Sequence, residues 1–363
     1  MRRKLWVILV ALLLAVGICD ALVWHLAVQG LRCGFANWAA AQRGDGWSVA
    51  TVPPQAGGWP LAATLTLRDV RLRGGADDVP GGLSWGAQRV VLRLGLRHPY
   101  VLQVEAMGNQ HLRLSDAPDI AYSARRLLLS VLLRPESQPR LLGIGLRAHL
   151  ASDPVAADAV TVNWLDAEFA PHPAASPGSQ PAQSVSLQAT GIDLPRRERW
   201  ALGREIAALK LDATLDGPLP DKPMLAANAR AWRDSGGRLT IQRLQTLWGP
   251  LDLTAHGTLW LDATLQPAGN ATTEITGYGP TLTALAHAGV MSRSAAIAAA
   301  AVLSLLADTP GGGGHSQVTV PLSLRHRILS VRQWPLLRLP VLDWPQQQAY
   351  KSHHESPDVH DAN

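Results

Sequence analysis

The sequence contains few cysteines and few of the smaller aromatic residues. Two cysteines, Cys19 and Cys33, occur in 363 residues, and Cys19 lies inside an apolar N-terminal run. A bridge between them is not expected, so the fold does not depend on disulfides even where the compartment permits them. Phenylalanine occurs twice and tyrosine four times. Phenylalanine and tyrosine are therefore scarce as filling for a core between two packed sheets, and the 13 tryptophans are scattered, most of them among strand ends and turns.

Nucleotide-binding motifs and a convincing metal site are also absent. The sequence has neither a Gly-x-x-x-x-Gly-Lys-Ser/Thr phosphate loop nor a Gly-x-Gly-x-x-Gly dinucleotide motif. The densest group of metal-binding residue types lies in the C-terminal tail, at His353, His354, Asp358, His360 and Asp361. A metal site needs ligands that neighbouring residues hold in place, and a tail does not provide this. Asp212 and Asp216 are interpreted as solvated strand residues. The sequence predicts a protein that is not an enzyme and has no cofactor.

The chain carries little charge, and its basic excess is small. Lys and Arg number 33 against 28 Asp and Glu, which gives a net charge of +5. The basic residues are nearly all arginine and are spread along strand-like segments, without the clustered basic and aromatic stripe of nucleic-acid-binding proteins. Nucleic acid is therefore not an expected partner. Two interpretations remain, a mildly basic face toward anionic lipid headgroups and a solvated surface with no specific partner.

Residues 1–30 are typical of a signal anchor. Arg2, Arg3 and Lys4 precede an apolar run that continues, with a break at Asp20, to Val28. A helix over residues 5–28 rises about 36 Å at 1.5 Å per residue, enough to cross a hydrocarbon core of about 30 Å. The residues chosen as the membrane anchor are Leu5, Trp6, Leu12, Val16, Val23 and Val28.

The alternative is a signal peptide that is cut after Ala21. Such a cut would place Cys19 and Ala21 at the −3 and −1 positions, a poor match to the small residues that cleavage prefers. We therefore expect an uncleaved, single-pass anchor. The positively charged N-terminus would stay in the cytoplasm, and the chain from about residue 30 onward would lie across the membrane.

Beyond residue 47, apolar residues alternate with polar ones in many segments. The pattern occurs at 61–74, 88–97, 143–151, 160–164, 184–194, 206–217, 236–249, 250–265 and 317–331. In the first segment the phase slips at Asp69, which predicts a β-bulge. Strands with one apolar and one polar side are typical of an antiparallel sheet with one dry face. The sequence predicts a mainly β fold, with long curved antiparallel sheet and a few helices.

The dry face is the candidate apolar groove. The residues chosen for it are Leu65, Leu67, Val90, Leu92, Leu94, Ile144, Leu146, Leu251 and Leu253. Leucine, valine and alanine on these faces would make an exposed hydrophobic surface if no second sheet covers it.

Helices and domain boundaries follow from composition. Helices are expected at 34–47, continuing the anchor, at 224–237, and at 279–307, where the pattern splits near Gly289 and Ser292. The Pro/Ser-rich segment 171–183 is interpreted as a linker or a long loop between two β-rich halves. These halves are 31–170 and 184–344, and residues 345–363 are expected to be a disordered tail. One continuous groove and two packed domains both fit this pattern.

Several sequence segments, taken in their order along the chain, also resemble those of known proteins. They are the anchor with its following helix, "GGWPLAATLTLRDVRL", "LWGPLDLTAHGTLWLDATLQPAG" and the closing "VTVPLSLRHRILSV". From about residue 5 to 340 the chain resembles an uncharacterised family of alphaproteobacterial envelope proteins, anchored in the inner membrane, that groups with the AsmA-like proteins. The resemblance implies a periplasmic antiparallel β-sheet. AsmA-like relatives are associated with outer-membrane assembly and with phospholipid traffic through apolar β-grooves. This chain is much shorter than the relatives that bridge two membranes, and the family supplies no catalytic residues.

These observations lead to one expected function and one alternative. We expect a non-enzymatic inner-membrane protein with its C-terminal body in the periplasm, which holds or helps transfer lipid in envelope homeostasis or outer-membrane assembly. The expected partner is membrane lipid. The alternative is a structural or scaffolding module with a closed, packed core that binds a protein partner in the envelope.

Overall fold

The computed structural model describes residues 2–74, 82–114, 118–134, 138–151, 158–172, 182–217, 226–308, 317–331, 334–342 and 344. Within these ranges, the side chains of residues 2–5, 7–11, 172, 182, 305–308 and 334–337 are not described. The expected tail, 345–363, and its histidines lie outside the described residues, as does most of the Pro/Ser-rich segment.

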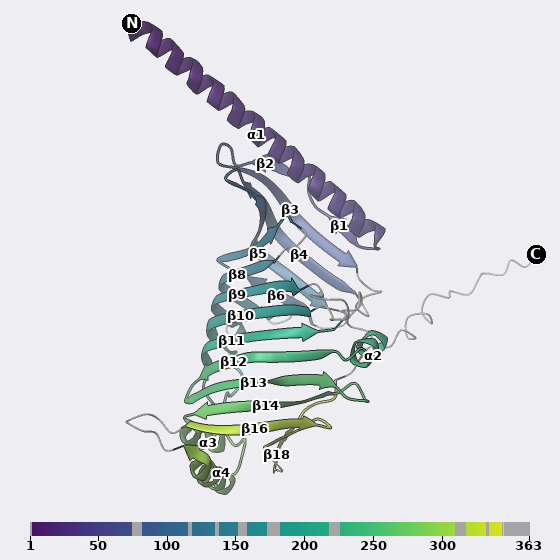
Figure 1. Ribbon diagram of the computed structural model, residues 1–363, viewed down its shortest axis with the longest axis vertical. Coiled ribbons are helices and arrows are strands. Elements are labelled where there is room, and N and C mark those ends of the chain that lie inside the picture. The colour runs from purple at the N-terminus through teal and green to yellow at the C-terminus, as the bar shows by residue number, and fades with distance from the viewer. Residues whose placement is uncertain are drawn as a thin grey trace, which may run out of the picture.

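The body is one long antiparallel sheet, as Figure 1 shows. Its strands in chain order are β1 (Ser48–Ala50), β2 (Gln55–Gly57), β3 (Ala62–Gly74), β4 (Leu83–Gly95), β5 (His98–Leu114), β6 (Ile120–Ser123), β7 (Arg126–Leu132), β8 (Arg140–Leu150), β9 (Val160–His172), β10 (Ala182–Asp193), β11 (Glu205–Asp216), β12 (Arg238–Trp248), β13 (Leu251–Leu261), β14 (Pro267–Thr276), β15 (Ala307–Asp308), β16 (Gln317–Arg325), β17 (Ile328–Val331) and β18 (Trp334–Arg338). From β3 onward each strand pairs mainly with the strand before it and the strand after it, which is a meander. The predicted mainly β, antiparallel fold is confirmed.

A few strands share a position in this meander. β1 and β2 both pair with β3 and form one edge of the sheet. β6 and β7 together fill the place between β5 and β8. β9 and β10 pair from Ala167 with Leu187 out to His172 with Ala182. The sheet therefore runs without a break through both of the β-rich halves that the sequence suggested.

The phase slip predicted at Asp69 is confirmed, but the extra residue of a β-bulge is not present in the pairing of β3 with β4. Asp69 adopts a φ of 51°, in the left-handed region, and no residue of β4 pairs with it. Gln88 of β4 is left unpaired with β3 in the same way, so the register keeps its count across the irregularity. Leu67 and Val70 both lie in the core although three positions separate them, and so do Ala87 and Val90 of β4. The slip keeps the apolar side of both strands on one face.

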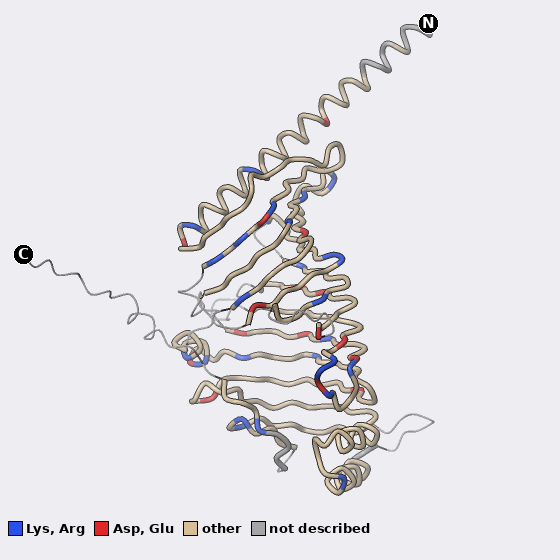
Figure 2. Tube along the Cα trace, turned by 180° about the vertical axis from the view of Figure 1, so that it is seen from behind, with Lys and Arg blue, Asp and Glu red and all other residues tan. Residues whose placement is uncertain are grey.

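Helix α1 (Arg2–Gly44) is a single continuous helix, exposed along its first half and packed on the sheet along its second half. Its outer part extends away from the body (Figure 2), and from Leu5 to Val23 the sequence carries one charged residue, Asp20. Trp6, Leu12, Val16 and Val23 are exposed there. The helix is long and apolar enough to cross a membrane.

The second half of α1 packs on β3 and β4. Val28 and Leu31 are buried there among Ala63, Leu65 and Leu67. The Nε1–H group of Trp24 donates a hydrogen bond to the carbonyl oxygen of Gly57 in β2, over 3.2 Å. The predicted continuation of the anchor helix through residue 44 is confirmed, and Val28, chosen as an anchor residue, lies in the protein core.

The other helices lie at the opposite end or edge of the sheet (Figure 1). α2 (Ala226–Asp234) packs against the turn after β13, where Leu265 is buried. α3 (Tyr278–His287) contacts β13, and α4 (Arg293–Leu306) contacts β16. The predicted split of the Ala-rich segment near Gly289 is confirmed.

Tryptophans secure several of the turns. Trp200 and Trp248 lie with ring centroids 6.3 Å apart, and their Nε1–H groups donate to backbone carbonyls of the β10–β11 connection. Trp232 of α2 donates to the carbonyl of Asp216, and Trp344 donates to that of Leu265. Each ring thus joins a wide apolar surface to one hydrogen bond at the rim of the sheet.

Candidate functional site: an open apolar face

One row of apolar residues crosses almost the entire sheet. Residues directly opposite each other on antiparallel strands point to the same face, so the pairing register traces the row from strand to strand. It consists of Leu65, Leu92, Val104, Leu129, Leu141, Ala167, Leu187, Leu211, Leu244, Ala255, Thr273 and Val320. We call this the central row, and only Thr273 in it is polar.

Two further rows flank the central row on the same face. The first is Leu127, Gly143, Leu165, Ala189, Leu209, Thr246, Leu253, Ile275 and Val318. The second is Phe169, Val185, Ala213, Ile241, Gly257, Ala271, Leu322 and Val331. The face that carries the three rows is the apolar face.

The opposite face of the same strands is polar. One row on it reads Asp166, Gln188, Lys210, Gln245, Thr254, Glu274 and Thr319. On this face the Nε–H group of Arg140 donates to Oδ1 of Asp166 over 2.8 Å, and this hydrogen bond holds the pKa of Asp166 below its ordinary value. One face of the sheet is therefore polar, and the opposite face is apolar.

The two ends of the apolar face are covered, and its middle is open. Under α1, Leu65 is 0% exposed, and at the far end Val318 and Val320 are buried as well. Among the described residues, helices make at most marginal contact with β7–β12, and each of these strands otherwise contacts only the strands that lie beside it in the sheet. Leu187 and Leu211 of the central row accordingly remain partly exposed. A contiguous apolar strip that stays open on a folded protein is typical of an interaction site.

The strip is long on a molecular scale. From β3 to β16 the central row makes eleven steps between neighbouring strands. At about 4.8 Å per step this amounts to roughly 53 Å. The open part of the row, from Leu129 on β7 to Leu244 on β12, makes five of these steps, about 24 Å. One leaflet is half of a hydrocarbon core of about 30 Å, so the open part is longer than one leaflet is deep.

Most of the candidate groove residues lie on the apolar face. Leu65 and Leu92 belong to the central row and Leu253 to a flanking row. Leu67, Val90 and Leu94 point to the same face. Of these residues, Leu65, Leu67 and Val90 are buried in the core cluster that α1 covers, and Leu92 and Leu94 pack against it, so these five do not line the open part of the face. Leu251 lies on the apolar face too, because it is two residues before Leu253 on the same strand. Leu146 lies on the same face as Leu251, because a line of paired residues joins them through Trp248, Ile206, Ile192 and Val162.

Ile144 lies on the polar side of the sheet. It pairs with Arg126 and Trp164 and is adjacent in sequence to Gly143 of the flanking row. Gly145 follows with a φ of 59°, and it is left out of the β8–β9 register. This irregularity shifts the alternation by one residue, so Ile144 and Leu146 do not share a face as simple counting suggests.

Sequence reasoning passed over one possible catalytic motif, a Gly-x-Ser-x-Gly sequence at Gly82–Gly86. In hydrolases such a serine lies at a sharp turn between a strand and a helix. Here Ser84 lies inside β4 and pairs with Arg73 and Arg113. The geometry of a nucleophile elbow is not present at this serine.

The acidic and metal-binding candidates do not assemble into a site. Asp212 and Asp216 are four residues apart on β11, about 13 Å at 3.3 Å per residue, which exceeds the spacing of about 5–9 Å in glycoside hydrolases. Asp212 accepts a hydrogen bond from Ser186 over 2.8 Å. In the part of the chain that the structure describes, three or more metal-binding side chains do not cluster anywhere.

Comparison with known proteins shows the family of the chain. Residues 24–340 match a family described as "Uncharacterized protein conserved in bacteria (DUF2125)", and the chain belongs to this family. Neither the curated proteins nor the solved structures contain a significant match. The matched region includes the packed half of α1 and the whole sheet.

Proposed function

We propose that this protein is a non-enzymatic, single-pass inner-membrane protein whose sheet holds lipid acyl chains on its apolar face. The body would lie in the periplasm, and the protein would serve envelope lipid homeostasis or outer-membrane assembly, as the likeness to AsmA-like proteins implies. The single observation that carries the proposal is the open middle of the apolar face between α1 and the α3–α4 pair.

The physical basis is the removal of hydrocarbon from water. Burial of one methylene group contributes about 0.8 kcal/mol, and an acyl chain on an open face would bury about half of its surface. A chain of ordinary length would gain several kilocalories per mole from the strip. A polar headgroup could stay in water at the edge of the sheet, since the strip needs to cover only the tail.

Position-specific crosslinking in living cells tests the proposal. A benzophenone amino acid would replace Leu211 in the central row, and a matched probe would replace Ala208. Ala208 lies on the same strand but pairs with Thr190 and Leu247 on the opposite face. Cells labelled with radioactive phosphate would be irradiated and the full-length protein purified under denaturing conditions.

The proposal expects a phosphate-labelled lipid adduct at Leu211 and none at Ala208. Equal labelling at both positions would mean random contact with lipid and would contradict it. Crosslinking of Leu211 to a protein of defined mass, without lipid, would support the scaffolding alternative and also contradict lipid holding.

A further inference from the structure

Three hairpin tips lie side by side next to α1. They are formed by residues 58–61 before β3, residues 96–100 at the start of β5, and residues 132–134 at the end of β7. The backbone N–H of Leu96 donates to the carbonyl of Leu61 over 3.3 Å, and that of Leu133 donates to Tyr100 over 2.7 Å. The three tips thus form one continuous surface, which we call the tip surface.

The position of the tip surface along α1 follows from two hydrogen bonds. Trp24 of the helix donates to Gly57, and Arg43 donates to the carbonyl of Val49 over 3.0 Å. Gly57 pairs with Thr64 and Val49 with Leu72. Because residues 24 and 43 of α1 lie near residues 64 and 72 of β3, helix and strand run in the same direction.

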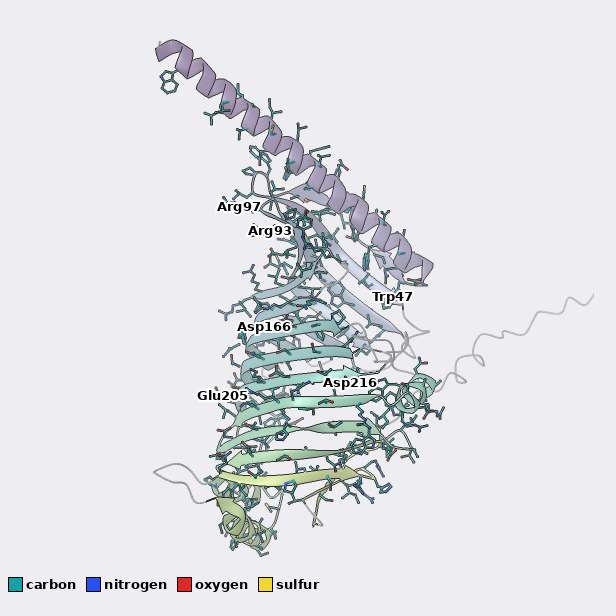
Figure 3. The ribbon with its side chains drawn as sticks, in the orientation of Figure 1. Trp47, Arg93, Arg97, Asp166, Glu205 and Asp216 are labelled. Carbon is teal, nitrogen blue, oxygen red and sulfur yellow. The ribbon has the colours of Figure 1, made fainter. Side chains whose placement is uncertain are left out.

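The tips consequently lie toward the apolar half of the helix. Leu61 precedes Thr64 by three residues, which displaces it by about 10 Å at 3.3 Å per residue. That displacement leads from Trp24 toward the membrane-crossing part of α1. Residues 5–23 rise about 29 Å, close to the thickness of a hydrocarbon core, so Trp24 lies near the level where the helix would leave the membrane. Figure 3 shows Arg97 close to α1 at this end of the sheet.

The side chains of the tip surface are those expected at a membrane interface. Leu61 is 73% exposed, Trp59 57% and Tyr100 56%, and Leu133 is exposed as well. The guanidinium of Arg134 stands over the ring of Tyr100 at 4.8 Å from its centre. Tryptophan and tyrosine collect at the headgroup level of bilayers, and arginine is attracted by anionic lipid.

A tip at the far end of the same edge has a different composition. The turn between β13 and β14 comprises residues 262–266, and Asp262 accepts hydrogen bonds from the hydroxyl and the backbone of Thr264. Its one large apolar residue, Leu265, is buried. Large exposed apolar side chains are therefore not a general property of the hairpin tips in this sheet.

We propose that the tip surface rests in the headgroup region of the bilayer that α1 crosses. Trp59, Leu61 and Leu133 enter the boundary between headgroups and acyl chains, while Arg97 and Arg134 contact lipid phosphates. The helix and the tips then fix the body to the membrane at two places, so the sheet keeps one orientation. The inference rests on α1 crossing a membrane, as proposed above, and is independent of lipid on the apolar face.

Depth-dependent quenching in the full-length protein tests this inference. The two native cysteines would be replaced by serine, and single variants Leu61→Cys, Leu133→Cys and Ala263→Cys would carry an environment-sensitive fluorophore. Val16→Cys serves as the reference inside the helix. Each protein would be placed in nanodiscs of phosphatidylcholine and phosphatidylglycerol in equal parts, with and without lipids that carry a quencher near the headgroup.

The inference expects strong quenching and a blue-shifted emission at Leu61 and Leu133, and neither effect at Ala263. Quenching at Leu61 and Leu133 as weak as at Ala263, with Val16 still in a lipid environment, would overturn the docking and leave the anchor intact. A water-exposed Val16 would instead refute the membrane helix, and with it both proposals of membrane attachment.

Discussion

A single carboxylate in the central row should weaken lipid holding at least tenfold without unfolding the protein. Leu211 lies in the open middle of the apolar face, directly between Leu187 and Leu244. It is only partly buried, so Leu211→Asp removes less packing than a substitution in a closed core. Aspartate is also too short to reach the edge of the sheet, and its charge would stay beneath any acyl chain bound there.

The size of the effect can be worked out from the environment. An aspartate at the centre of a membrane-spanning helix costs about 2.5–3.5 kcal/mol. Since the face is open to water on one side, about half of this cost is expected. With 1.4 kcal/mol per tenfold change, lipid occupancy should fall by about tenfold, and by about a hundredfold if the chain fully covers the site.

The assay is the yield of phosphate-labelled lipid crosslinked to a benzophenone at Leu187, normalised to the amount of protein. The control is Ala208→Asp, which adds the same charge to the same strand on the polar face. Thermal unfolding of both variants shows whether either is merely misfolded.

An unchanged crosslinking yield in Leu211→Asp would refute the reasoning. An equal loss in both variants, at equal stability, would also refute it, because the face of the sheet would then not matter.

Three further outcomes are expected. Leu65→Ala should lower the free energy of unfolding by about 2–5 kcal/mol, because Leu65 is fully buried beneath α1. The measurement is thermal unfolding of the full-length protein in detergent. Leu211→Ala, at a partly exposed position, should show a smaller loss of stability. The pair formed by Arg140 and Asp166 should stabilise the fold above a pH of about 4, the ordinary range of an aspartate, because the folded-state pKa of Asp166 is lowered. Stabilisation should fade as the pH drops through that folded pKa, so the stability difference between wild type and Arg140→Gln should narrow in acid, and a constant difference would contradict this. Intact mass of the mature protein should include residues 2–21; a chain that begins at Leu22 would show that the anchor is cleaved.

The positions and the phase of many strands could be predicted from local pattern, although β5, β6, β7 and β14 were not among the predicted segments. Alternation with a period of two marks a strand with one dry side, and the slip at Asp69 was readable because Leu67 and Val70 interrupt that period. The shift at Gly145 was missed, since Ile144 and Leu146 keep a regular alternation in sequence. Only the register with β9 shows that a glycine with positive φ separates them.

The boundary between the exposed part and the packed part of α1 is also invisible in its sequence. Val23 and Val28 are equally apolar, yet Val23 is exposed and Val28 is buried against β3. An unbroken apolar helix carries no local signal where packing against the sheet begins. Contact with Ala63 and Leu65 defines the core side of that boundary.

The amino-acid sequence alone determined the class of fold and the apolar and polar sides of many strands. It also determined an N-terminal helix that is long and apolar enough to cross a bilayer. These are local properties, set by side-chain periodicity and by the length of an apolar run. Only the tertiary structure decided that a single sheet joins both halves, that α1 and the α3–α4 pair cover its ends while the middle stays open, and that three distant hairpins meet beside the helix. Those features depend on which distant segments touch, and a local pattern carries no information about that.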